Sequence, residues 1–245
     1  MNPTLVVLVL SSLAAAAAAL GVLPLAARRT APAVWFGWSN ALAAGLMLGA
    51  AYALSEAGVE IAATPMAGGA VAGALLILWS HRASHTEELD LNRLGGGDAD
   101  PVYGYQVLLV SFLHAASEGV AIGAAMAASL PLGVFLALVM AVHNVPEATV
   151  LSAVLASRGV TLPQAAALAV AVNGAQVLLA VATFAVVGAA PWLLPVTLGY
   201  AAGALVYLTL VELLPQSYRQ AGATSIAVVT SLALGAMIAL QGLLP

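Results

Sequence analysis

Eight long apolar segments dominate the sequence and determine its fold class. Each is close to the roughly 20 residues that an α-helix needs to cross the hydrocarbon of a bilayer. Mean hydropathy is +1.06 and 7% of residues are charged, so there is too little polar surface to cover a soluble globule of 245 residues. The sequence predicts an all-α integral membrane protein, a single transmembrane domain over residues 1–245 with eight transmembrane helices. The helices are expected at about 3–26, 33–56, 60–80, 103–128, 131–156, 161–188, 191–214 and 224–244.

The basic residues predict how the chain lies in the membrane. All six are arginines, and an eight-helix topology puts them on one side: Arg28, Arg29, Arg82, Arg93, Arg158 and Arg219. Because short cytoplasmic loops carry an excess of basic residues, we expect this side to be cytoplasmic and both termini to lie outside. The long polar loop at about 81–101, which contains histidines, acids and glycines, is then a flexible cytoplasmic segment.

Several function classes are excluded by what the chain lacks. There is no cysteine, which removes disulfides, thiolate metal sites and thiol nucleophiles. There is no lysine, which removes cofactors held as a Schiff base, and we expect no organic cofactor. With a net charge of -4 and no basic run, nucleic acid is not a predicted partner. We expect a multi-pass protein of the cell membrane, with the lipid bilayer as its environment.

Two copies of the pattern His-x-x-x-Glu occur inside these apolar segments. "SFLHAASEGVAIG" holds His114 and Glu118, and "AVHNVPEATV" holds His143 and Glu147. Residues four apart lie on one face of a helix, so each copy presents an imidazole and a carboxylate together. An ionisable group at mid-membrane costs at least ~2.5 kcal/mol on insertion scales and persists where it meets a partner or a water-filled path. On consecutive antiparallel helices the two pairs are expected to converge.

Two nitrogen and two oxygen ligands suit a divalent ion of zinc character, whereas Mg²⁺ and Ca²⁺ favour more oxygens. One histidine beside one carboxylate is commonly only a structural pair, but repetition at the same spacing favours a metal site. Asn144 offers a further amide oxygen, and Pro146 is expected to kink its helix and free a carbonyl there.

The segments "LAAGLM" at 42–47 and "YAAGAL" at 200–205 are similar to each other. They fall on predicted helices of opposite orientation, as do the two His-x-x-x-Glu copies. This indicates an inverted repeat around a mid-membrane site, an architecture common among secondary transporters.

Four segments together resemble the ZIP family of divalent-metal transporters: "ALAAGLML", "HAASEGVAIGAA", "HNVPEA" and "GALVYLTLVELLP". The resemblance covers nearly the whole chain, including eight helices, outward termini and a histidine-containing loop between the third and fourth helices. It implies transport of zinc, iron, manganese or cadmium toward the cytoplasm, often by a homodimer. It also implies a primary site between helices 2, 4 and 5, formed by Met47, His114, Glu118, His143 and Glu147.

The chain also departs from the family pattern near this site. Ala115 stands where the family usually has Asn, Asn144 where many members have an acid, and "NGAQVLLA" where the sixth helix usually carries Glu before Pro. Gln176 is the nearest candidate in that last segment. The second metal position of a binuclear centre thus loses its own carboxylates, and we expect one metal site.

Other polar residues are candidates for a secondary metal site or for the ion pathway. Asn173 and Gln176 either contribute to the site or only hydrogen-bond neighbouring helices. Glu56 and Glu60 could attract cations to an outer entrance or simply be solvated. Glu212 could act at the cytoplasmic exit or cap a helix, and His81 and His85 could pass the ion on or belong to a polar loop with no such role.

These expectations combine into one function with two alternatives. We expect the ion to cross by alternating access, binding to the His/Glu cluster and being released when the helices that carry it move. The alternatives are an intramembrane zinc-dependent hydrolase and a metal sensor that does not transport. A hydrolase is disfavoured because there is no His-Glu-x-x-His segment and no spare general base, and a sensor because no signalling domain is visible.

Overall fold

The computed structural model describes residues 2–27, 32–84 and 101–243, and every element within them is helical. This confirms the predicted helical membrane class. Seven helical segments in the described part of the chain are long and apolar enough to cross a membrane. They are Pro3–Ala27, Ala33–Ala83, Tyr105–Ala128, Leu130–Ser157, Leu162–Ala189, Pro191–Gln220 and Ala223–Gln241.

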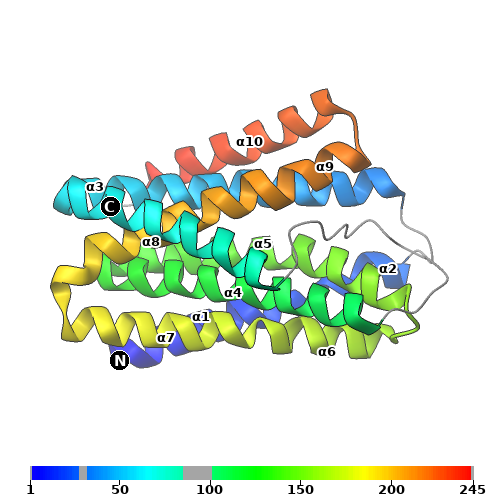
Figure 1. Cartoon of the computed structure of the whole chain (residues 1–245), viewed down its shortest axis with the longest axis horizontal. Helices are drawn as coiled ribbons and strands as arrows, with labels where there is room; N and C mark the ends of the chain where they lie inside the picture. The colour runs from blue at the N-terminus through cyan, green and yellow to red at the C-terminus, as the bar shows by residue number, and fades with distance from the viewer. Residues whose placement is uncertain (1, 28–31, 85–100, 244–245) are drawn as a thin grey trace.

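The second of these, α3 (Ala33–Ser84), holds two of the predicted apolar segments. Its 52 residues would extend about 78 Å as a straight helix, more than twice the hydrocarbon thickness of a bilayer. The backbone of Ala62 is not helical, with φ -165° and ψ 104°. The chain reverses at this point, so the two halves of α3 run in opposite directions (Figure 1), and α8 (Leu194–Leu208) packs against both of them.

The C-terminal end of α3 corrects one prediction. The helix continues to Ser84, so residues 81–84, which include His81 and Arg82, are helical. The prediction that the polar loop starts at residue 81 is therefore wrong by these four residues. His81 is 3% exposed because its side chain points into the bundle. The prediction ends the helix where the apolar residues end, so it cannot detect a buried polar residue beyond that point. His85 and the remainder of the predicted loop lie outside the described residues.

Two antiparallel helices, α4 (Pro101–Ala128) and α5 (Leu130–Ala156), carry the two His-x-x-x-Glu pairs near their middles. They are joined at Ser129, whose hydroxyl accepts a hydrogen bond from the Leu132 amide at 3.3 Å and so begins α5. Pro146 lies inside α5, which remains one helix. The sixth predicted helix is instead broken at Asn173 into α6 (Leu162–Val172) and α7 (Gly174–Ala189).

The N-terminal segment consists of α1 (Pro3–Ala17), the 3₁₀ turn η1 (Ala18–Val22) and α2 (Leu23–Ala27). The C-terminal part begins with η2 (Pro191–Leu193), α8 (Leu194–Leu208) and a π-helical turn, η3 (Thr209–Leu213). It ends with α9 (Leu214–Gln220) and α10 (Ala223–Gln241). Both ends of the chain lie at the same end of the bundle (Figure 1).

The helices form two packed groups. In one group α1, η1, α4, α5, α6 and α7 pack against each other, and in the other α3, α8, α9 and α10 do so. The groups meet where α3 packs on α5 and α8 packs on α4. The two helices that carry the His/Glu pairs therefore lie in one group and face the other.

Gly21 allows η1 to pack directly behind the ligand-bearing part of α5. A Cβ atom at this position would lie 2.6 Å from both the carbonyl carbon and the Cβ of Ala148, the residue after Glu147. Neither atom can move without moving α5, so the close approach requires glycine.

We expect Gly21→Ala to lower the free energy of unfolding by about 1–3 kcal/mol, the usual cost of overpacking. Thermal unfolding of the detergent-solubilised protein measures this. Gly174→Ala is the control, because a Cβ there would meet nothing within 4 Å. Equal melting temperatures for the two variants would contradict the expected packing.

Candidate metal centre

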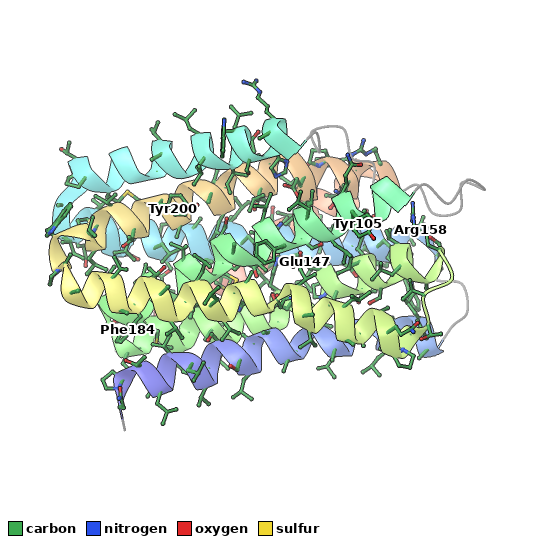
Figure 2. All side chains as sticks on the ribbon, turned by 60° about the horizontal axis from the view of Figure 1, so that its bottom comes forward. Tyr105, Glu147, Arg158, Phe184 and Tyr200 are labelled. Carbon is green, nitrogen blue, oxygen red and sulfur yellow. The ribbon has the colours of Figure 1, made fainter. Side chains whose placement is uncertain are left out.

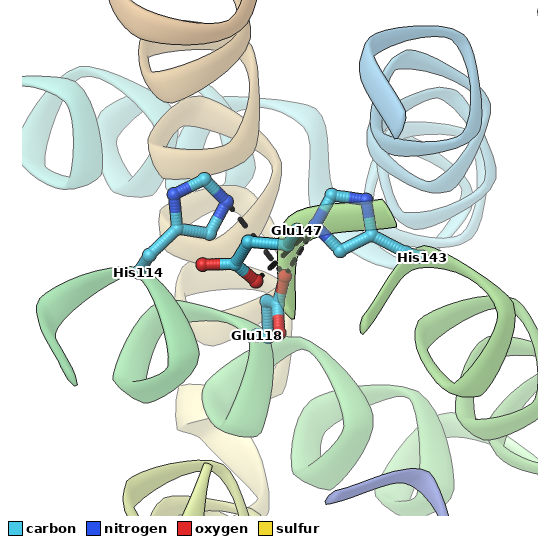
Figure 3. A group of neighbouring side chains, drawn as sticks. All are labelled: His114, Glu118, His143 and Glu147. Carbon is cyan, nitrogen blue, oxygen red and sulfur yellow. Dashed lines mark ion pairs between the residues drawn. The ribbon is translucent and has the colours of Figure 1, made fainter. Parts of the chain in front are cut away.

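Four side chains from α4 and α5 converge inside the bundle and form a candidate metal site, from here on named the metal centre: His114, Glu118, His143 and Glu147. One ligand atom from each lies within 4.8 Å of the others (Figure 3). Glu118 and His143 are fully buried, His114 is 3% exposed, and Glu147 is partly buried. The structure thus brings together the two pairs that the sequence placed on neighbouring helices.

The Glu118 carboxylate lies between the two imidazoles. Its Oε1 atom is 2.9 Å from His143 Nε2 and 3.7 Å from His114 Nε2. The imidazole rings are stacked, with centroids 5.8 Å apart and planes inclined by 19°. Glu147 approaches from the same helix as His143, with its Oε2 3.8 Å from His143 Nε2. One carboxylate oxygen and two ring nitrogens therefore point at one small volume (Figure 3).

Several polar atoms of the metal centre have no hydrogen bond within the described part of the chain. They are both carboxylate oxygens of Glu118, both ring nitrogens of His143 and Oε2 of Glu147, each almost inaccessible to solvent. Their mutual contacts are ion-pair distances only. Burying such groups without partners is costly, and a cation that accepts their lone pairs removes the cost. The donor set suits a divalent transition metal.

Met47, on the first half of α3, brings a sulfur atom to the metal centre from the other helix group. Its Sδ atom lies 3.4 Å from His114 Nε2, and the side chain is fully buried. A thioether is a soft ligand, so it favours metals such as zinc and cadmium over hard cations.

Glu212 lies beside the metal centre on the π-helical turn η3. Its Oε2 atom is 3.9 Å from His114 Nδ1, and its Oε1 atom is 2.9 Å from His81 Nε2. Pro215 has no amide hydrogen for an intrahelical bond, which is consistent with the widened turn. Glu212 thus connects the metal centre to His81 near the end of α3.

The buried amides near the centre are hydrogen-bonded, Asn144 to neighbouring helices and Asn173 within its own helix. Asn144 Nδ2 donates to Gln176 Oε1 and to the Ala14 carbonyl oxygen, at 2.9 Å each. Asn173 Nδ2 donates to the Ala169 carbonyl oxygen at 2.9 Å, where α6 ends. The structure places Asn144 and Gln176 beside the centre and Asn173 at the helix break.

The two outer acids are far from the metal centre. Glu56 and Glu60 are exposed near the turn of α3, and Glu56 accepts a hydrogen bond from Gln241 of α10. This turn lies at the end of the bundle where the chain begins and ends (Figure 1).

A cavity reaches the metal centre and is lined by His114, Glu147 and Glu212. The cavity is also lined by Val107 and Val154. These residues lie toward the end of the bundle where Tyr105 of α4 and Arg158, just after α5, are found (Figure 2). Sequence reasoning missed the cavity's other polar lining residues, Asn40, Ser111 and Gln216. Gln216 directly follows one of the segments that resemble the ZIP family, and Asn40 is an amide inside an apolar segment. Both positions could have been recognised from the sequence as candidate polar residues of the bundle interior.

A buried cluster of two histidines and two carboxylates, beside a cavity within a bundle of apolar helices, has the donor set of a divalent-metal site in a membrane protein. The ZIP zinc transporter family model matches residues 80–240, and the chain belongs to this family. Over 233 residues the chain is 32% identical to an Arabidopsis thaliana protein that is named as a proposed zinc transporter. That match covers 94% of this chain and 37% of the length of the relative. Membership of a transporter family argues against an enzyme.

We expect Glu118→Gln to weaken Zn²⁺ binding more than about 100-fold, because changes in the second shell alone typically cost about 10–100-fold. The amide keeps the shape but loses the charge between the two imidazoles. Competition with a fluorescent chelator in detergent measures the affinity. Glu60→Gln is the matched control, since an exposed acid outside the centre can alter the arrival of ions but not their equilibrium affinity. An unchanged affinity in Glu118→Gln would show that the centre does not bind the ion.

Proposed function

We propose that the protein carries divalent transition-metal ions, zinc before iron, manganese or cadmium, toward the cytoplasm by alternating access through one intramembrane site. The observation that supports this most is the convergence of four buried ligand atoms within 4.8 Å at the inner end of a cavity. A structural metal needs no cavity beside it, whereas cargo needs a pathway, of which we propose this cavity to be a part. The metal ligands are Met47, His114, Glu118, His143 and Glu147.

The proposed topology has eight passes with both termini outside. Counting α3 as two passes makes the number even, in keeping with chain ends at one end of the bundle. Arg82, Arg158 and Arg219 follow or end helices at the opposite end, which is then the cytoplasmic one. A homodimer, implied by the family resemblance, is likewise a proposal.

The cavity gives the pathway a direction. Since it extends from the metal centre toward the arginine-bearing end, we assign it to the cytoplasmic half of the pathway. Glu212 and His81 lie next along this route, and their pair at 2.9 Å offers transient ligands to a departing ion. Glu56 and Glu60 lie at the other end and are proposed to attract cations there.

The two helix groups support the proposed movement. Glu118 and His143 belong to the group of α1, α4, α5 and α7, whereas Met47 and Glu212 belong to the group of α3 and α8 to α10. Movement of one group against the other would separate these ligands and let the ion leave. A sensor without transport would bind the ion with the same ligands, so only flux separates the two functions.

We expect vesicles that carry the full chain to take up Zn²⁺ onto an enclosed fluorescent chelator. His143→Ala should abolish uptake, because it removes the nitrogen that lies 2.9 Å from Glu118. Ser225→Ala, outside both centre and cavity, should transport like the wild type. Zinc binding without uptake in the wild type would favour the sensor.

We also expect Zn²⁺ affinity to rise as the pH increases from about 5 to about 8, the range in which imidazoles change charge. The ligands must be deprotonated to bind, so protons compete with the ion at low pH. Titrations at fixed ionic strength measure this. An affinity independent of pH would exclude histidine ligands.

A further inference from the structure

We infer that the hydrogen-bonded pair of Asn144 and Gln176, the amide pair, restricts the metal centre to a single divalent ion. The inference rests on the proposed function, because it assumes that the centre binds such ions. It assigns a specificity role to two neutral side chains that do not themselves need to touch the ion.

The amide pair borders both carboxylates of the metal centre. Asn144 precedes Glu147 by three residues on α5, which puts them on neighbouring positions of one helix face. Gln176 packs against Gly119, the residue after Glu118, so closely that a Cβ there would lie 2.4 Å from the Gln176 carbonyl oxygen. Both amide side chains are fully buried.

The hydrogen bonds of the pair leave few ligand atoms for a second ion. Asn144 Nδ2 donates to Gln176 Oε1 and to the Ala14 carbonyl oxygen, which engages both of its hydrogens. Gln176 Oε1 is occupied as the acceptor. Asn144 Oδ1 and Gln176 Nε2 have no hydrogen bond within the described residues, so the pair could offer a second ion one neutral oxygen and no charge.

Charge balance gives the same limit. Glu118 and Glu147 together supply two negative charges, which neutralise one divalent ion. A second ion would leave two uncompensated positive charges at mid-membrane, where even one charge is costly. Glu212, the next carboxylate, lies 2.9 Å from His81 and 3.9 Å from the Nδ1 atom of His114, the ring nitrogen that does not face Glu118.

The test replaces each amide with the carboxylate of the same shape. Asn144→Asp with Gln176→Glu raises the number of carboxylates around the centre to four, the charge of two divalent ions. The full chain in detergent is loaded with Zn²⁺ alone and desalted, and the zinc per chain is measured by mass spectrometry. We expect one ion in the wild type and two in the double variant.

Gln164→Glu is the control, because it adds a carboxylate at the exposed start of α6, where Gln164 bonds only Thr161 in the described contacts, and it should keep one ion. If the pair has only a structural role, the double variant will be less stable and will still bind one zinc ion per chain. A folded double variant with one zinc ion per chain would therefore overturn the inference. Anomalous scattering at the zinc edge counts ions in the wild type without any variant. Two peaks at the metal centre there would also overturn it.

These outcomes are separate from those of the transport proposal. One bound ion without vesicle uptake contradicts transport and leaves the inference standing. Two bound ions with uptake overturn the inference and leave transport standing.

Discussion

The contact between Glu118 and His143 holds the two ligand-bearing helices in register. At 2.9 Å it joins the middle of α4 to the middle of α5, with both side chains fully buried. A carboxylate in this position is tolerable in a membrane only if positive charge or polar partners surround it. The two imidazoles meet part of that need, and a bound cation would meet the rest. Among the described residues, the same constraint explains why charged side chains outside the centre and its neighbour Glu212 lie near helix ends or the turn of α3: Glu56, Glu60, Arg82, Arg158 and Arg219.

The packing around this contact is unusually close because small residues surround it. Gly21 lets η1 approach the backbone of α5, and Gly119 lets α7 approach α4 beside Glu118. In a bilayer, where apolar side chains gain little by leaving lipid, such close approach and buried hydrogen bonds are the main forces between helices. Asn144 adds bonds to α1 and α7. The ligands of α4 and α5 are therefore supported from behind by their own helix group, while α3 and η3 face them from the other.

Much of this could be predicted from the sequence, for physical reasons that differ from part to part. Lipid demands long apolar helices, so their positions could be read from hydropathy, and helical periodicity alone pairs His114 with Glu118. Met47 came only from the family resemblance, because one methionine in an apolar helix has no signal of its own. The burial of His81 depends on a partner at Glu212, and the bond from Asn144 reaches Ala14, 130 residues away. Contacts between segments so distant are set by tertiary packing, which no local pattern encodes.

Five polar side chains form a row of neighbouring contacts that starts at the metal centre and runs toward the arginine-bearing end of the bundle. His143, Glu118, His114, Glu212 and His81 follow one another with separations of 2.9, 3.7, 3.9 and 2.9 Å. An ion held by all ligands at once would be bound too tightly to leave, whereas an ion with one further carboxylate within reach can exchange ligands one at a time. His114 lies between Glu118 and Glu212, so it can contribute to both environments. A site that exchanges its ligands stepwise needs little free energy at any single step, as the proposed carrier function requires.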